Sequence, residues 1–386
     1  MLKKKNTHNR KSLLRFYLAH LLFISIIAII LSTCCSATKE KTPSLWETQV
    51  LAIDKYGFTA INLTGDDLVS SGYAHGDIFA VKLGNSEFEA PLVTNLSDVD
   101  IASELLGDPG TPHNLLFAIN MGDFAGKYNL NIGDTISIAI KEKGGYLESW
   151  KLRQMSRTYI REDYASDEIF ANFREVTVGN IAPGRLYRNS HPVNPEFGRH
   201  TYANALAEKA RVVTVVNLAD SRERLEYYFA QEGFSSFFYK DLYDNGQVLC
   251  LDMGIDINSD SFKSKLNDGL IFITENDAPY MIHCNEGKDR AGFTLALIEA
   301  LMGADIDEIV TDYMLSFVNY YHLVPGSQQY QAVAEGTIMK TLRIIAGIPV
   351  DANINDVDLQ LAAEKYIVAL GIDKSFISII KSNLSH

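Results

Sequence analysis

The run Met281-Ile282-His283-Cys284-Asn285-Glu286-Gly287-Lys288-Asp289-Arg290-Ala291-Gly292-Phe293 decides the fold and the chemistry expected of this chain. An apolar run, residues 278–282, precedes a polar loop that contains a glycine, and a helix-like apolar run, residues 293–302, follows it. The pattern predicts a strand, a loop and a helix in succession. This arrangement places backbone amides and a helix N-terminus around an anion the size of phosphate.

Two residues of this loop carry the expected chemistry. Cys284 stands at its start, where the amides, the helix dipole and the cations Lys288 and Arg290 favour the nucleophilic thiolate. Arg290 can fold back over the loop and hold two phosphate oxygens with its planar guanidinium. A nucleotide-binding Walker loop fits poorly, because no glycine stands five residues before Gly287 and neither Ser nor Thr follows Lys288. The loop therefore predicts phosphoryl transfer to a cysteine.

The same residues resemble a known family. His283-Cys284, followed after five residues by Arg290, resembles the loop of cysteine-dependent phosphatases, and the fuller pattern His-Cys-x-x-Gly-Lys-Asp-Arg-x-Gly resembles their bacterial tyrosine-phosphatase-like branch, which includes dual-specificity and lipid phosphatases. Further runs similar to that branch are residues 172–176, 183–190, 312–316 and 362–366. The resemblance therefore extends from residue 172 to the C-terminus. It implies a phosphocysteine intermediate on Cys284 and requires no metal or other cofactor.

The resemblance also implies roles for the other residues of the loop. The residues expected to bind phosphate are Asn285, Glu286, Gly287, Lys288, Asp289 and Arg290, with His283 orienting the loop. The acid that protonates the leaving oxygen stays open between two candidates. Asp289 lies inside the loop, and Asp241 is expected in a flexible loop after a strand at residues 234–239. Asp220 and Asp244 are weaker alternatives, both expected to be solvated.

Two departures from the family pattern leave alternatives open. Ala291 stands where many relatives have Ser or Thr, and Asn217-Leu218-Ala219 lacks an acid and an arginine that the branch often has. A weakly active module that binds a phosphorylated ligand is therefore an alternative to a tyrosine-phosphatase-type enzyme. Lys288 keeps phosphoinositides and inositol phosphates open as substrates. A thiol-based reductase fits less well, because arsenate reductases usually carry such a loop near the chain start. Cys250 is expected to be an inert buried thiol, with a disulfide to Cys284 as the alternative.

The pattern along residues 171–386 predicts an α/β catalytic domain with a mostly parallel central sheet flanked by helices. Apolar strands are expected at residues 212–218, 234–239 and 278–282, and helices at residues 201–209, 261–274, 293–302, 306–319, 330–345 and 359–370. The cysteine then lies at the C-terminal end of a strand, where such folds bind ligands.

Residues 46–146 have a different pattern, with short β-like runs separated by turns, and residues 147–170 form a connector. The expected strands are residues 48–53, 78–83, 88–93, 115–119 and 134–140. We therefore expect a small β-rich barrel or sandwich. Since it carries no catalytic motif, a structural or targeting role is expected.

The first 35 residues combine six Lys or Arg, an apolar run and small residues, which is typical of an export signal. Leu31-Ser32-Thr33-Cys34 resembles a bacterial lipoprotein cleavage box, in which Cys34 would be acylated, although Thr33 departs from it. An uncleaved anchor and simple secretion are the alternatives, and residues 36–45 would be a tether. The chain is thus expected outside the cytoplasm, and membrane-anchored.

The formal net charge of −13 excludes some partners. Residues 1–33 hold six basic residues and no acid, so the remainder has 29 basic and 48 acidic residues and a charge of −19. Such a body does not attract nucleic acid. The four cysteines have neither a disulfide nor a metal-ligand spacing. The expected partner is a phosphorylated protein, phosphoinositide or inositol phosphate; the oligomeric state stays open.

Overall fold

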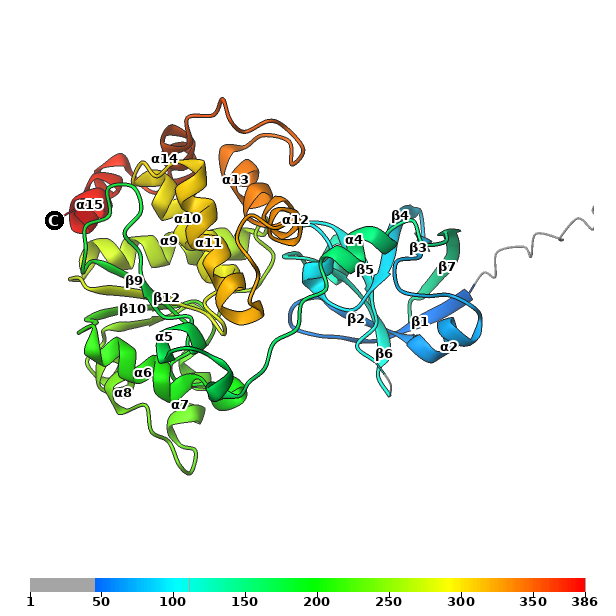
Figure 1. Cartoon of the computed structure of the whole chain (residues 1–386), viewed down its shortest axis with the longest axis horizontal. Coiled ribbons are helices and arrows are strands. Elements are labelled where there is room, and N and C mark those ends of the chain that lie inside the picture. Colours follow the sequence, from blue (N-terminus) through cyan, green and yellow to red (C-terminus); the bar gives the residue numbers. More distant parts are fainter. Residues whose placement is uncertain (1–45, 111, 386) are drawn as a thin grey trace, which may run out of the picture. The chain divides into compact units, whose positions relative to one another are not determined.

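The computed structural model describes residues 46–110 and 112–385 (Figure 1). The expected export signal, its Cys34 and the tether lie outside the described residues. Trp46–His386 form one compact unit. No helix in the described ranges has both the length and the apolar character that crossing a bilayer requires.

The N-terminal strands close into a barrel, with the order β1-β2-β6-β5-β4-β3-β7. The strands are β1 (Trp46–Ile53), β2 (Thr59–Thr64), β3 (Ile78–Leu83), β4 (Ser86–Val93), β5 (Glu104–Gly107), β6 (Asn114–Ile119) and β7 (Thr135–Glu142), and the short helices are α2 (Gly65–Ser70) and α3 (Phe124–Tyr128). Alternate residues of β3, namely Phe79, Val81 and Leu83, are buried, as expected of a strand with one face in a core. Because β1 pairs with both β2 and β7, the barrel alternative of the prediction is the right one.

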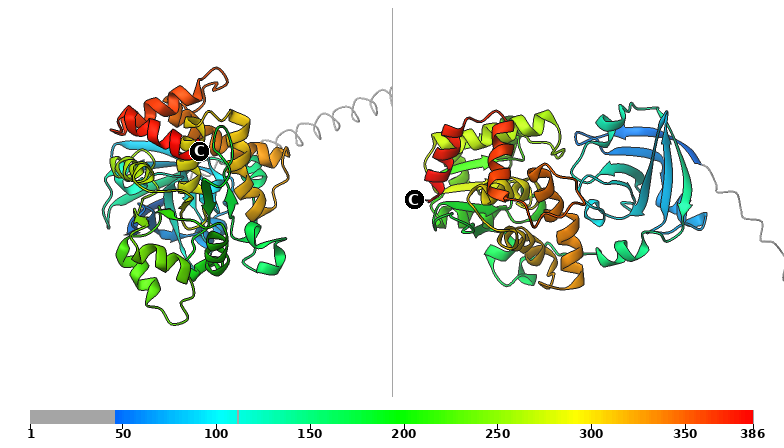
Figure 2. Two further views of the ribbon diagram at one scale, coloured as in Figure 1. Left: turned by 90° about the vertical axis from the view of Figure 1, so that its left-hand side faces the viewer. Right: turned by 90° about the horizontal axis from the view of Figure 1, so that it is seen from above.

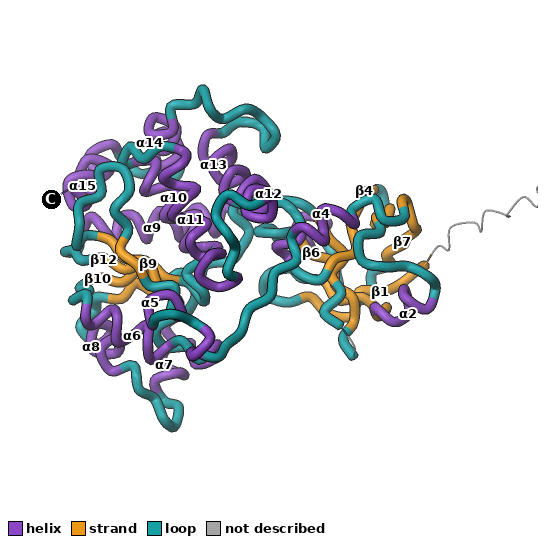
Figure 3. Tube along the Cα trace, in the orientation of Figure 1, coloured by secondary structure: helices purple, strands orange, loops and turns teal. Residues whose placement is uncertain are grey.

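A five-stranded sheet lies at the centre of the C-terminal part of the chain (Figure 3). Its strands, in spatial order, are β11 (Val248–Cys250), β10 (Thr214–Asn217), β12 (Tyr280–His283), β9 (Leu186–Asn189) and β8 (Arg174–Glu175). The sheet is mixed: the pairs β11–β10, β10–β12 and β12–β9 are parallel, and β8–β9 is antiparallel. The strands that flank the expected loop are therefore parallel, and their carboxyl ends meet at one edge.

Helices cover both faces of this sheet (Figures 1 and 2). The helices after the barrel are α4 (Leu147–Leu152), α5 (Asp167–Phe170), α6 (His200–Lys209), α7 (Arg222–Phe229), α8 (Phe237–Asp244), α9 (Asp260–Glu275), α10 (Asp289–Leu301), α11 (Ile306–Tyr321), α12 (Gln328–Gly336), α13 (Ile338–Ala346), α14 (Leu359–Ala369) and α15 (Lys374–Ser385). Val215 of β10 and Met281 of β12 pack against α6, α7 and α8, whereas the next residues, Val216 and Ile282, pack against α9 and α10. This alternation follows from the period of two along a strand.

Two sequence-based assignments are wrong. The strand expected at residues 234–239 is not formed, because α8 begins at Phe237 and buries Tyr239 and Leu242, which are three residues apart on one helical face. The single helix expected at residues 330–345 is divided at Thr337, whose backbone (φ −121°, ψ −88°) leaves the helical region. This break leaves the carbonyl of Gly336 free to accept a hydrogen bond from the Ile101 amide at 2.8 Å.

Barrel residues also enter the core of the α/β part. Ile101 and Met121 are buried in the same apolar cluster as Phe293 and Leu297 of α10. Beside them, Asp100 accepts hydrogen bonds from Arg153 (2.5 Å) and forms an ion pair with Lys340 (3.3 Å). The two parts therefore share buried apolar surface as well as polar contacts.

Candidate active site

The expected strand, loop and helix are formed around Cys284. The strand β12 ends at His283 and α10 begins at Asp289, so the loop comprises residues 284–288. The helix begins four residues earlier than expected, and Arg290 therefore lies in its first turn. The loop leaves the carboxyl end of β12, between β10 and β9. This is the edge at which α/β sheets bind their ligands.

The carbonyl groups of this loop are all held by donors from the surrounding protein. The acceptors, each with its donor, are Cys284 (His283 Nδ1, 3.3 Å), Asn285 (His191 amide, 3.1 Å), Glu286 (Asn172 Nδ2, 3.1 Å, and Tyr320 hydroxyl, 2.6 Å), Gly287 (Arg188 Nε, 2.7 Å) and Lys288 (Arg188 Nη2, 3.0 Å). Peptide carbonyls and amides point in roughly opposite directions around such a turn. Fixing the carbonyls outward therefore directs the amides inward.

The amides of the same residues are unpaired. Within the described ranges, the backbone N–H groups of residues 285–288 donate to no protein acceptor. Gly287 makes the turn with φ +63°, a region that side chains disfavour, and a Cβ there would lie 2.1 Å from the Asn189 carbonyl oxygen. The loop and the N-terminus of α10 thus form a nest of free donors suited to an anion.

A buried charge network supports the loop from below. Arg188 is fully buried and donates to the Asp312 carboxylate (2.6 Å) as well as to the loop carbonyls, and Arg174 donates to the same carboxylate (2.7 Å). Burial alone would raise the pKa of Asp312, but the two guanidinium groups hold it well below its ordinary value. Burial and the charge of Asp312 raise the pKa of the neighbouring Glu299, which is therefore neutral and donates a hydrogen bond to Asp312.

Cys284 and Arg290 line one cavity of about 470 Å³, together with Asn285, Glu286, Lys288 and Asp289. Arg290 is anchored through Nη1, which donates to the Met253 carbonyl (2.8 Å) and the Leu218 carbonyl (3.2 Å). In the described part of the chain, its Nε and Nη2 have no protein acceptor. The guanidinium therefore keeps donors free beside the loop.

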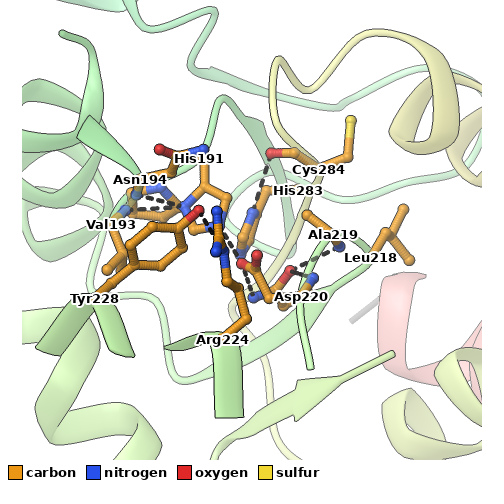
Figure 4. A network of polar contacts seen from close by, with 12 residues as sticks. His191, Val193, Asn194, Leu218, Ala219, Asp220, Arg224, Tyr228, His283 and Cys284 are labelled. Atoms are coloured by element: carbon orange, nitrogen blue, oxygen red, sulfur yellow. Dashed lines mark hydrogen bonds and ion pairs between the residues drawn. The ribbon is translucent and has the colours of Figure 1, made fainter. Parts of the chain in front are cut away.

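His283 lies directly before Cys284 and is neutral. It is fully buried, its Nδ1 donates to the Cys284 carbonyl, and its Nε2 accepts from the Tyr239 hydroxyl at 2.9 Å. Burial, and next the nearby His191, lower the pKa of His283 to about 3. Figure 4 shows the Cys284 sulfur turned away from the His283 ring. The His283 ring thus contacts the loop through the Cys284 carbonyl.

Asp220 belongs to a buried network beside His283, contrary to the expectation of a solvated side chain (Figure 4). The amides of Val193 and Asn194 each donate to His191 Nδ1 at 3.0 Å, so Nε2 carries the proton that it donates to Asp220. Burial opposes ionisation of Asp220, but the hydrogen bonds from His191 and Asn217 lower its pKa to about 2. Asp220 does not line the cavity that holds Cys284, so it is poorly placed to protonate a leaving group there.

The other candidate acids differ in position. Asp289 lines the cavity, is partly exposed, and lies 2.7 Å from the ammonium of Lys288. Asp241 lies on the exposed face of α8 and does not line this cavity. Asp244 is exposed and paired with Lys240 at 2.6 Å, as expected of a solvated residue. Asp289 is therefore the only one of the three that borders the cavity.

The surroundings of Lys288 and Cys250 determine whether each side chain is charged. Lys288 is buried, and its ammonium lies 4.8 Å from the Phe317 ring centre. Burial would lower the pKa of Lys288, but Asp289 and further neighbours raise it, so the side chain is charged. Cys250 is a free thiol whose pKa is raised to about 11 by burial, which makes it unreactive at neutral pH.

The rest of the cavity wall was not predicted. It comprises barrel residues such as Phe58, Leu96, Leu105 and Leu116, together with Ile255 and Arg157 of the connector. No local pattern distinguishes these residues from ordinary core or surface residues. In the described ranges, no group of three or more His, Cys, Asp or Glu could hold a metal ion.

Comparison with known proteins assigns the chain to a family. Residues 168–385 match the model of a tyrosine phosphatase family, and the chain belongs to that family. No curated protein matches the chain. Among solved structures, the crystal structure of an uncharacterized conserved protein from Thermotoga maritima is similar at 27% identity, with a TM-score of 0.23. The match covers 24% of this chain and 35% of that one.

Proposed function

We propose that this chain is a phosphomonoesterase that uses Cys284 as its nucleophile. The observation that carries the proposal is the polarity of the loop: the carbonyls of residues 284–288 are bound by protein donors, and the amides of residues 285–288 are free. A phosphoryl group in this nest lies beside Cys284 and the free nitrogens of Arg290. These donors stabilise the charge that develops on the phosphoryl oxygens.

The reaction proceeds in two displacements. The Cys284 thiolate attacks phosphorus, the bond to the leaving oxygen breaks, and the Asp289 carboxyl gives that oxygen its proton. Water then attacks the phosphocysteine, its proton passes to the Asp289 carboxylate, and the phosphorus–sulfur bond breaks to release phosphate and the thiolate. The residues of this chain supply the nucleophile, the acid and the positive field for both steps.

The charges around the cavity favour a substrate with a single phosphate. Its lining holds three cations, Arg157, Lys288 and Arg290, and two acids, Glu286 and Asp289. Each acid is paired with one of these cations, which leaves little positive charge for a second or third phosphate. The lining outside the loop includes the apolar residues Phe58, Leu105 and Leu116, and these suit an aromatic ring better than a polyhydroxylated inositol. We therefore propose aryl phosphates of the phosphotyrosine type as substrates.

A substrate screen on the full-length chain tests this proposal. We expect phosphotyrosine peptides to be hydrolysed at least tenfold more efficiently than phosphoserine peptides, phosphoinositides or inositol phosphates, with Cys284→Ser as the inactive control. A preference for inositol phosphates would overturn the substrate proposal. Phosphate binding without any turnover would instead identify a module that binds phosphorylated ligands.

The role of Asp289 has its own test. In Asp289→Asn, hydrolysis of a poor leaving group such as an alkyl phosphate should slow by roughly 10²–10⁴-fold, whereas that of nitrophenyl phosphate should slow far less, because nitrophenolate leaves without a proton. Asp241→Asn is the matched control and should affect neither substrate. If Asp289→Asn slows both substrates equally, Asp289 is not the acid.

We also propose, from the sequence alone, that the chain is exported and tethered to a membrane through acylated Cys34, with an uncleaved N-terminal anchor as the alternative. Support comes from the basic and apolar character of residues 1–35. Labelling with radioactive palmitate should mark the wild-type chain and leave Cys34→Ala unlabelled. An unlabelled wild-type chain that stays in the membrane fraction would favour the uncleaved anchor.

A further inference from the structure

One charge at the loop is balanced by a residue outside the α/β sheet. The Glu286 carboxylate forms an ion pair with the guanidinium of Arg157, which lies in the connector after α4. Both side chains are mostly buried, at 15% and 16% exposed respectively, and both line the cavity. No other ion pair joins this loop to the connector in the described residues. A carboxylate of the loop is thus paired with a cation that comes from the connector.

The position of Arg157 is fixed by aromatic rings. Its guanidinium carbon lies 5.2 Å from the ring centre of Tyr159, 5.6 Å from that of Tyr320 and 5.3 Å from that of Tyr321. Tyr320 in turn donates its hydroxyl to the Glu286 carbonyl. Burial would lower the pKa of Arg157, but Glu286 and the neighbouring tyrosines raise it, so the group is permanently charged. The rings therefore hold a fixed positive charge against the Glu286 side chain.

The charge count of the cavity shows what this pair does. With Arg157, the lining carries three cations and two acids; without it, the two cations Lys288 and Arg290 face the two acids Glu286 and Asp289. The cavity would then have no net positive charge while Asp289 is ionised. Glu286 would repel an approaching phosphate dianion from beside the amides that must bind it, in a partly buried setting where screening by salt is weak.

We propose that Arg157 is a positioning residue that neutralises Glu286 and so allows a phosphate dianion to occupy the loop. The proposal rests on the phosphate site described under the proposed function. The proposal predicts that a second substitution, which removes the opposing charge, restores phosphate binding. The loss of phosphate binding on removing Arg157 should disappear when Glu286 is also made neutral, because the repelling charge is then gone.

Four full-length proteins test this inference: wild type, Arg157→Met, Glu286→Gln and the double variant. The Kd of inorganic phosphate is measured by titration calorimetry, which needs no turnover. We expect Arg157→Met to raise the Kd by about tenfold, consistent with one charge interaction in a partly buried site. Glu286→Gln should bind phosphate at least as tightly as wild type, and the double variant should return to within about threefold of Glu286→Gln.

Two further variants separate charge from structure. Arg157→Lys keeps the charge and should bind phosphate close to wild type, whereas Arg161→Met, which removes a connector arginine paired with Asp167, should not change the Kd. With nitrophenyl phosphate, Arg157→Met should raise KM by about the same factor as the Kd and change kcat little.

The outcomes separate a failure of this inference from a failure of the proposed catalytic function. A double variant as weak as Arg157→Met, or a Glu286→Gln variant that binds phosphate tenfold more weakly than wild type, would overturn the inference, even if Arg157→Met itself failed to fold. A wild-type chain that binds phosphate without hydrolysing any ester would refute the catalytic proposal and leave this comparison valid. A wild-type chain that does not bind phosphate would overturn both.

Discussion

The geometry of Gly287 makes a quantitative prediction for the substitution Gly287→Ala. The residue has φ +63°, where an L side chain costs about 1–2 kcal/mol. The new Cβ would also lie 2.1 Å from the Asn189 carbonyl oxygen and 2.6 Å from its carbon, so either β9 or the loop must move. A rigid clash of this kind adds roughly 1–3 kcal/mol. We therefore expect the free energy of unfolding to fall by about 2–5 kcal/mol, and phosphate affinity to fall at least tenfold, because the amides move with the loop.

Gly246→Ala is a matched control. Gly246 has a similar φ of +76°, but a Cβ there has nothing within 4 Å. In Gly246→Ala, the free energy of unfolding should fall only by the conformational cost of about 1–2 kcal/mol. The affinity for phosphate should stay as in wild type. Chemical denaturation measures both free energies, and calorimetry with inorganic phosphate measures affinity. The reasoning would be refuted if Gly287→Ala matched Gly246→Ala in stability and bound phosphate as wild type does.

Three further predictions concern the surroundings of the loop. Asp312→Asn should destabilise the fold by about 3–5 kcal/mol in thermal or chemical denaturation, because it removes the ionised carboxylate that the buried Arg174 and Arg188 share. Asp307→Asn, at an exposed position on the same helix, should change the stability by less than about 1 kcal/mol. His283 has its pKa lowered to about 3, so the stability it confers is complete above its unfolded-state pKa of about 6.5 and falls as the pH drops toward 3; His283→Gln should flatten the pH dependence of unfolding between pH 6.5 and 4, and an unchanged slope would contradict this. Ala291 supplies no hydroxyl for the departing thiolate, so rapid-quench experiments should detect accumulated phosphoenzyme in wild type and less in Ala291→Ser.

The part of the site that the sequence predicts is local. Cys284, the amides of residues 285–288 and Arg290 lie within seven residues, so the spacing alone places them around one anion. The buried strands β10 and β12 and the amphipathic helices α6, α9 and α11 were predicted for the same reason, since an apolar period is a property of a short segment. The five expected barrel strands likewise appear as parts of β1, β3, β4, β6 and β7.

The features that were missed depend on distant segments. Arg188 reaches Asp312, 124 positions away, and Arg157 reaches Glu286 across more than a hundred residues, so neither pairing leaves a local pattern. The aromatic run at residues 234–239 has strand-forming composition, but tertiary burial of Tyr239 and Leu242 selects a helix. Asp220 was taken for a solvated residue because nothing near it in the sequence indicates the approach of His191.

The participation of Ile101 and Met121 in the α/β core affects how this chain can be divided. A fragment cut after the barrel would expose the apolar faces that these two side chains cover and would lose the hydrogen bond between Ile101 and Gly336. Such a truncated fragment should be prone to aggregate, even with every catalytic side chain present. The barrel thus contributes to the core of the α/β part, and a foreign domain put in its place would have to cover the same apolar surface.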